Sequence, residues 1–293
     1  MTIVAIVGPT ASGKSALALR VAEMLGGEIV SADSRQVYRG LDVGTAKPSR
    51  AERERMPHHL IDVADVGERY DVARYQREAR AAVADIQRRG KRPIVSGGTG
   101  LYVRALLDGL ALSALPADPD VRAGLEEAAA SGGGAALHQR LAELDPEAAA
   151  RVDARNVRRV IRYLEIALLA GPPTRTQTRE APVPAVRIGL APPRDWIDAR
   201  IEARARSMVD QGVLDEAAML RARALDPRLP SLTAHGYVHW IAHLEGRIDL
   251  ETAVAKTVRD TRAYARRQMT WFRRDPEIRW IDPTSSDPLE LLR

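Results

Sequence analysis

The sequence of 293 residues predicts an α/β fold, in which helices flank a mainly parallel sheet and an all-helical insertion separates two of its strands. Two observations favour this fold class. Short apolar runs typical of buried strands alternate with helical periodicity over the first hundred residues, and such alternation is typical of a parallel sheet. From about residue 112 to 185, by contrast, the sequence shows helical periodicity without a convincing strand.

The strands are predicted from these apolar runs in chain order. The first spans residues 2–7, and a glycine-bearing turn joins it to a helix in which Leu17, Val21 and Leu25 recur at helical spacing. Strand, turn and helix together open a β-α-β unit. The remaining strands are predicted over residues 28–31, 93–96, 186–190 and 278–281.

Long helices are predicted over residues 197–224 and 250–273. One face of the second carries Val254, Val258, Thr261, Tyr264, Gln268 and Trp271. The insertion contains a flexible Ser/Gly stretch at 131–134 and a Pro/Thr-rich segment at 171–184. We therefore divide the chain into a core of residues 1–111 and 186–293 and a helical insertion domain of residues 112–185.

The composition argues against several classes of protein. No run approaches the roughly 18 apolar residues of a membrane helix, and the apolar start lacks a charged leader. The absence of cysteine excludes disulfides and cysteine-ligated zinc and fits a reducing compartment, so we expect a cytoplasmic monomer that does not bind a membrane. The net charge of +5 is concentrated in residues 151–200 and 256–274, as in a nucleic-acid-binding surface.

Residues 8–15 match the phosphate-binding loop (P-loop) pattern at every defined position, between a predicted strand and a predicted helix. The glycines let successive N–H groups curl around a phosphate, Lys14 adds positive charge, and Ser15 supplies a hydroxyl for Mg²⁺. The fold class is therefore P-loop NTPase-like. The loop is compatible with a nucleoside triphosphate or a diphosphate ester, and its candidate ligands are Gly8, Pro9, Thr10, Ala11, Ser12, Gly13, Lys14 and Ser15.

The apolar strand ending in aspartate that usually accompanies a P-loop is not obvious in this sequence. The strand predicted at 93–96 runs into glycines and Thr99, whereas the acid Asp33 follows the strand at 28–31. Because residues after the carboxyl ends of parallel strands line the ligand crevice, Asp33 and Thr99 should both face the P-loop. Asp33 could hold Mg²⁺ through water, act as a base, or be only an N-cap or turn residue.

Segments in this order along the whole chain resemble the bacterial tRNA dimethylallyltransferases, or isopentenyl-tRNA transferases, of the IPP transferase family. The resemblance lies in residues 8–15, 33–48, 57–62 and 97–102, and continues through 156–165, 200–204, 236–237 and 267–271. It implies transfer of a dimethylallyl group from dimethylallyl diphosphate to N6 of the adenosine 3′ of the anticodon. The implied acceptors are tRNAs that read codons beginning with U, and the other product is pyrophosphate.

The resemblance also implies roles for individual residues. The P-loop would hold the diphosphate, with Mg²⁺ at Ser15 and with Arg204 absorbing charge on the leaving group. Asp33 matches the family's catalytic aspartate, which would accept the N6 proton as general base. Thr99 matches a threonine near the attacking nitrogen and the leaving oxygen, and its hydroxyl can both donate and accept a hydrogen bond.

Contacts to the tRNA anticodon stem-loop are expected in two regions. The target nucleotide should be flipped into a pocket beside Asp33, Ser34, Arg35, Gln36 and Thr99. The insertion would add Arg122, Arg155, Arg158, Arg159 and Arg162. The alternative is that the insertion's basic face is an ordinary solvated helix surface. A further stripe from Lys256 to Arg266 could contact RNA or form internal ion pairs.

Other functions share part of this pattern. A P-loop small-molecule kinase or an adenylate isopentenyltransferase needs the loop and a base but no RNA-binding surface, and the arginine-rich insertion argues against both. An RNA-binding module without chemistry does not need Asp33 and Thr99 opposite a P-loop. The adjacent His58 and His59 are interpreted as structural or substrate-positioning residues, not as metal ligands.

Overall fold

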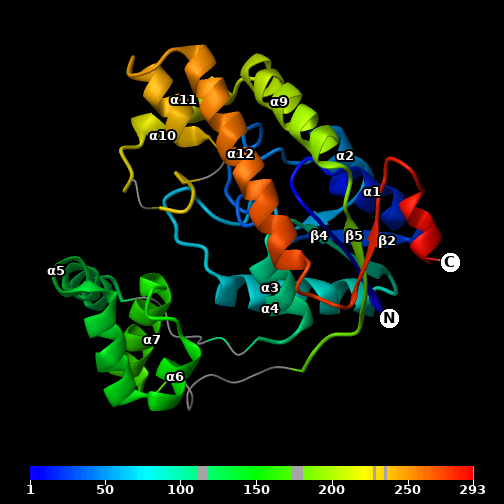
Figure 1. The fold of residues 1–293 in the computed structure, drawn as a ribbon. Coiled ribbons are helices and arrows are strands. Elements are labelled where there is room, and N and C mark those ends of the chain that lie inside the picture. Colours follow the sequence, from blue (N-terminus) through cyan, green and yellow to red (C-terminus); the bar gives the residue numbers. More distant parts are fainter. Residues whose placement is uncertain (111, 113–117, 173–180, 227–228, 234–235, 293) are drawn as a thin grey trace. The chain divides into compact units, whose positions relative to one another are not determined.

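The computed structural model describes residues 1–110, 112, 118–172, 181–226, 229–233 and 236–292. The chain forms two compact units, shown in Figure 1: a core unit of Met1–Asp108 with Pro182–Arg293, and an insertion unit of Gly109–Ala181. Each is described by itself. Across the described residues, no helix is both long and apolar enough to cross a membrane.

A six-stranded sheet forms the centre of the core unit, with strand order β3-β2-β4-β1-β5-β6 and parallel pairing throughout. The predicted α/β fold with a mainly parallel sheet is confirmed. Only the two-residue β3, which pairs with β2, was not predicted. The strands are β1 (Ile3–Val7), β2 (Gly27–Ser31), β3 (His58–His59), β4 (Arg92–Gly97), β5 (Ala185–Leu190) and β6 (Ile278–Ile281).

The central strand β1 is apolar on both sides, and helices cover both faces of this sheet. Val4 and Ile6 pack with α1 (Lys14–Leu25) in one hydrophobic cluster. Ile3, Ala5 and Val7 point to the opposite face, as alternation along a strand requires. Residues of several helices join them there, among them α3 (Val72–Arg88), α4 (Gly100–Leu107), α9 (Arg194–Asp210) and α12 (Leu250–Phe272).

The remaining core helices are short. The prediction of one helix over residues 197–224 is wrong, because α9 ends at Asp210 and a separate helix, α10 (Val213–Ala222), follows. Gly212 separates them in the left-handed conformation, with φ of 95°, which a helix interior does not allow. The others are α2 (Arg50–Arg55), α11 (Tyr237–Leu244) and the 3₁₀ helix η1 (Pro288–Leu292).

The secondary-structure elements described in the insertion unit are all helices. It consists of α5 (Pro119–Leu144), α6 (Pro146–Arg151) and α7 (Val157–Ala170), packed around Leu125, Leu141, Val160 and Leu164. The Ser/Gly stretch at 131–134, expected to be flexible, is instead part of α5, and only Gly133 leaves the helical conformation. The helix kinks there. Most of the Pro/Thr-rich segment at 171–184 lies outside the described residues.

Candidate active site

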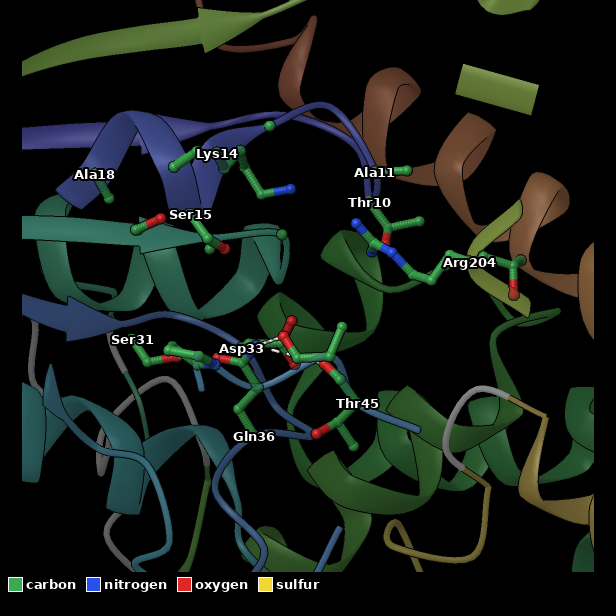
Figure 2. A pocket seen from close by; sticks show the side chains of 18 of the residues that line it. Thr10, Ala11, Lys14, Ser15, Ala18, Ser31, Asp33, Gln36, Thr45 and Arg204 are labelled. Carbon is green, nitrogen blue, oxygen red and sulfur yellow. Dashed lines mark hydrogen bonds between the residues drawn. The ribbon is translucent and has the colours of Figure 1, made fainter. Parts of the chain in front are cut away.

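The carboxyl ends of β1, β2 and β4 meet at one edge of the sheet, and the P-loop, Asp33 and Thr99 follow these three strands. A cavity of about 290 Å³, here called the P-loop cavity, opens at this edge. Figure 2 shows Lys14 of α1, Arg204 of α9 and Asp33 around one space. The topology therefore brings together the charged groups predicted to bind and activate a ligand.

The P-loop is shaped by its glycines. Gly8 has φ of 142°, and a Cβ there would lie 2.7 Å from the carbonyl oxygen of Leu190, so no other residue fits. Gly13 is the N-cap of α1 with φ of 93°, and no side chain caps the helix. By contrast, Asp71 and Asp249 cap α3 and α12. The first N–H groups of α1 are thus left for an anion.

The P-loop cavity has an excess of poorly solvated positive charge. Burial lowers the pKa of Lys14 to about 8, an effect that Asp33 opposes and Arg204 reinforces. Burial, followed by repulsion from Arg200, also lowers the pKa of the Arg204 guanidinium. Both cations would regain stability beside a bound anion, so the charge at this end of the cavity is suited to phosphate groups.

Two arginines of α9, one helical turn apart, hold the P-loop from the other side. The Arg200 Nε donates to the carbonyl oxygen of Ala11 at 3.1 Å, and Arg204 Nη1 lies 3.5 Å from the Thr10 hydroxyl. Arg204 thus lies beside the P-loop and lines the P-loop cavity. Arg200 was not singled out from the sequence, and its i, i+4 spacing from Arg204 was the available signal.

Asp33 and Thr99 are held together by a close approach of two strand ends. A Cβ on Gly97 would lie 2.1 Å from the carbonyl oxygen of Ala32, so only glycine lets β4 end this close to β2. The backbone N–H of Ser34 donates to Thr99 Oγ1 at 3.0 Å. One carboxylate oxygen of Asp33 accepts from the Arg35 N–H at 2.9 Å, so Asp33 shapes this turn while its carboxylate lines the P-loop cavity.

The neighbouring predicted residues divide between two cavities. Ser34, Arg35 and Thr99 line a second one of about 540 Å³, here called the Thr99 cavity. Gln36 lines the P-loop cavity instead, where its amide contacts Ser31 and the carbonyl oxygen of Ala46. The two cavities share four lining residues: Gly98, Thr261, Tyr264 and Gln268.

Gln268 is a residue of this site that was not predicted, since in the sequence it appears within the segment 267–271 and as one position on the face of a long helix. Its side-chain oxygen accepts from the Thr10 N–H at 2.8 Å, and its nitrogen donates to the carbonyl oxygen of Gly98 at 2.9 Å. It therefore ties the P-loop to the turn before Thr99. An amide on a face of mainly apolar and aromatic side chains is the signal that could have found it.

No cluster of three acidic, histidine or cysteine side chains that could hold a metal occurs in the described part of the chain. His58 and His59 contact different partners, the carbonyl oxygen of Met56 and the carboxylate of Glu28, each at 2.8 Å. The exposed Ser15 lines the P-loop cavity with Asp33 across from it. Mg²⁺ commonly binds one or two protein oxygens plus substrate phosphates and water, and these residues fit that mode.

The insertion unit separates the predicted arginines into two groups. Arg122 and Arg162 each lie 2.6 Å from the fully buried carboxylate of Glu165. Arg155 pairs with Asp153, whereas Arg158 and Arg159 are exposed on α7. Arg122 and Arg162 therefore hold the unit together, and the exposed Arg155, Arg158 and Arg159 are the part of this face available to a partner.

The basic stripe of α12 is largely paired within the core unit. Arg262 lies 3.1 Å from Glu202, and Arg259 lies 2.9 Å from Asp260. Arg266 and Arg267, farther along, line a shallow hollow with the partly exposed Trp271. Internal ion pairs thus account for the middle of the stripe.

A family model described as "IPP transferase" matches residues 36–275. A tRNA dimethylallyltransferase of Roseiflexus sp. (strain RS-1) is 48% identical over 287 residues, covering 97% of this chain and 94% of the relative. One from Anaeromyxobacter dehalogenans (strain 2CP-C) is 50% identical over 300 residues, covering 100% and 98%.

Solved structures agree. The full-length tRNA isopentenylpyrophosphate transferase from Bacillus halodurans superimposes with a TM-score of 0.72 at 41% identity, covering 99% of this chain and 93% of that one. A eukaryotic dimethylallyltransferase acting on tRNA gives a TM-score of 0.82 at 27% identity, covering 97% and 74%. The predicted family and P-loop NTPase-like fold are confirmed, and the chain belongs to the IPP transferase family.

Proposed function

We propose that this protein transfers the dimethylallyl group of dimethylallyl diphosphate to N6 of the adenosine 3′ of the anticodon, in tRNAs that read codons beginning with U. The observation that carries this proposal is the pair of cavities with a shared wall. The P-loop cavity suits a phosphate anion, and the Thr99 cavity lies beside Thr99. Asp33 follows β2, which pairs with β4, the strand that leads to Thr99. With tRNA as its substrate, the protein would act in the cytoplasm.

The reaction exchanges one bond for another. The N6 lone pair forms a bond to C1 of the allylic group, and the C1–O bond breaks with its electrons remaining on pyrophosphate. The N6 proton passes to the carboxylate of Asp33, which compensates for the weak nucleophilicity of an adenine amine. Lys14, Arg204 and the P-loop N–H groups stabilise the charge that develops on the leaving group.

Mg²⁺, when bound, would neutralise part of the diphosphate charge. Ser15 is the residue proposed to hold it, together with phosphate oxygens and water. The target nucleotide would be flipped out of the anticodon loop into the Thr99 cavity, which Ser34 and Arg35 line together with residues of α12. Gln36 would act from the P-loop cavity, and the insertion unit would bind the stem-loop.

The proposal is tested by measuring pyrophosphate release from the purified protein. We expect release only when dimethylallyl diphosphate, Mg²⁺ and unmodified tRNA are all present, with one prenyl group found on adenosine per pyrophosphate. Replacing the allylic diphosphate by ATP tests the kinase alternative, and replacing tRNA by adenylate tests the adenylate isopentenyltransferase. Turnover in either arm would overturn the assignment.

Binding of dimethylallyl diphosphate without tRNA should weaken as the pH rises through about 8. The pKa of Lys14 is lowered to about 8, so the amine is charged below this pH and loses its proton above it. Because the diphosphate favours the charged amine, affinity should be highest below pH 8. Calorimetric titrations across this range measure the effect. Lys14→Met should bind dimethylallyl diphosphate more weakly, and its affinity should not change with pH over this range. An equally steep fall of affinity with pH in that variant would mean that a group other than Lys14 titrates.

Neutralising Arg158 and Arg159 together should flatten the salt dependence of tRNA binding. If both contact phosphates, the slope of log affinity against log salt should fall by about 1.5 when both become glutamine. Arg50→Gln with Arg88→Gln, two exposed arginines of the core unit, is the matched control. An unchanged slope in the α7 variant would make this basic face an ordinary solvated surface.

A further inference from the structure

The C-terminal part of α12 borders the Thr99 cavity and takes no part in the proposed chemical steps. A shallow hollow of about 420 Å³ lies there, here called the Trp271 hollow. Six residues line it: Ala263, Arg266, Arg267, Thr270, Trp271 and Arg274. The hollow shares Ala263, Arg267 and Trp271 with the Thr99 cavity, so the indole of Trp271 stands at the border of the two spaces.

Trp271 is seated against the chain and still stays partly exposed. A Cβ on Gly100, the first residue of α4, would clash with Cδ1 and Nε1 of the indole. The five-membered ring therefore rests directly on the glycine that follows Thr99. Even so, 37% of Trp271 is exposed, and the exposed Leu101 and Val238 line the Thr99 cavity with it. A fixed, partly exposed aromatic ring is a surface on which a nucleobase can stack.

The arginines of the hollow have no acidic partner. Arg266, Arg267 and Arg274 are exposed and form no ion pair within the described part of the chain. Residues 261–274 contain no acidic side chain, and the acids that flank this segment are already paired. Asp260 lies 2.9 Å from Arg259, and Asp275 lies 2.6 Å from Arg187. Free guanidinium groups beside an exposed ring are typical of surfaces that bind single-stranded nucleic acid.

Arg267 links the hollow to the Thr99 cavity. Its guanidinium carbon lies over the ring of Tyr264, 5.8 Å from the ring centre. Tyr264 itself lines the Thr99 cavity. Two successive nucleotides share one phosphate, and Arg267, which lines both spaces, is placed to bind it.

We propose that Trp271 stacks on the base of the nucleotide next to the flipped adenosine, while Arg266, Arg267 and Arg274 bind the phosphates beside that base. The inference rests on the proposed function and adds a second base-binding site to it. Flipping the adenosine deprives its neighbours in the loop of a stacking partner, and the indole replaces this partner. Because every base has a π-face, the stack adds affinity without selecting a particular base.

The test is a double-mutant cycle between protein and RNA, measured as the Kd of the full chain for an anticodon stem-loop. Trp271→Leu keeps an apolar group against Gly100 but has no ring, and it should weaken binding about tenfold. Trp271→Tyr keeps a ring and should stay within about threefold. If Trp271→Leu does not fold, Trp271→Met carries the same expectations.

The RNA half of the cycle removes one base at a time, with an abasic site either 5′ or 3′ of the target adenosine. At the neighbour that stacks, the abasic RNA should bind the unmodified protein about tenfold more weakly. It should bind Trp271→Leu no more weakly than intact RNA does, because the stack is already lost. The position at which the two losses fail to multiply identifies the base.

Trp280→Leu is the matched control for the indole. Trp280 also packs against a glycine, since a Cβ on Gly189 would clash with its ring, and it lines neither cavity nor the hollow. The Kd of this variant should stay within twofold.

The arginines are tested by the salt dependence of binding. Replacing Arg266 and Arg274 with glutamine should lower the slope of log affinity against log salt by about 1.4, since each contact to a single-stranded phosphate contributes about 0.7. The exposed pair Arg50→Gln with Arg88→Gln again serves as control.

Three results would overturn the inference: a Kd for Trp271→Leu within twofold of the unmodified protein, losses that multiply at both abasic positions, or an unchanged salt slope. The first two would make Trp271 only a packing residue beside Thr99. All are read relative to an unmodified protein that binds the intact stem-loop. Absence of that binding would instead overturn the proposed function, so the two failures are distinguishable.

Discussion

Replacing Asp33 with asparagine should lower kcat for prenyl transfer about a thousandfold and change tRNA affinity by less than about threefold. Loss of a general base typically costs two to four orders of magnitude. The amide oxygen of asparagine can still accept from the Arg35 N–H, the 2.9 Å contact that shapes the turn. The variant thus separates chemistry from loop structure, which an alanine would not do.

The measurement is single-turnover transfer, with tRNA binding followed separately. It should be made near pH 7, because Asp33 helps Lys14 keep its proton and the asparagine variant lowers the pKa of that amine further. Asp282→Asn is the matched control: its carboxylate accepts from the Thr284 N–H at 2.9 Å in the same kind of turn, remote from both cavities. A large loss of tRNA binding in Asp33→Asn would make Asp33 a recognition residue, and an unchanged rate would exclude it as the base.

The P-loop half of the site could be predicted because it depends on local chemistry. The loop needs glycines, a lysine and a hydroxyl at fixed spacing, and all of them lie within eight residues of the chain. Asp33 could be placed opposite it because the carboxyl ends of parallel strands share one edge of the sheet. These inferences need only the order of strands and turns, which apolar periodicity reveals.

The other half of the site depends on contacts that spacing does not encode. Gln268 reaches Thr10 from 258 positions away along the chain, and its polarity on the helix face does not indicate which partner it has. Gly212 separates α9 from α10 although the helical pattern of the sequence continues across it. A single left-handed residue interrupts the helix without changing the spacing of the apolar residues. In both cases tertiary structure decides what the local pattern leaves open.

Arginine spacing in the insertion misleads for the same reason. Arg158, Arg159 and Arg162 follow one another at helical spacing and look like one basic face. The structure takes Arg162 out of that face by pairing it with Glu165, which lies between the buried Leu164 and Ile166. A carboxylate inside an apolar run was the sign that some arginines had an internal partner.

Replacing Glu165 with alanine should destabilise the insertion unit by about 3 kcal/mol, because it leaves two partly buried arginines without their carboxylate. Glu165 is fully buried and accepts from Arg122, Arg162 and the Asp118 N–H, so it joins the start of α5 to α7. Denaturant unfolding should show the loss. Glu147→Ala, which removes an exposed pair with Arg151, should cost no more than about 0.5 kcal/mol.

The same variant separates the roles of the two units. If the insertion binds the stem-loop, Glu165→Ala should weaken tRNA binding about twofold at the midpoint of its unfolding and about tenfold where nine-tenths of the unit is unfolded, while the affinity of the P-loop cavity for dimethylallyl diphosphate stays within about twofold. Glu165→Gln still accepts hydrogen bonds, so its free energy of unfolding should lie between those of the unmodified protein and Glu165→Ala. A stability loss below about 1 kcal/mol in the alanine variant would mean that Arg122 and Arg162 are free to turn outward. They would then return, with Arg158 and Arg159, to the candidate tRNA-binding surface.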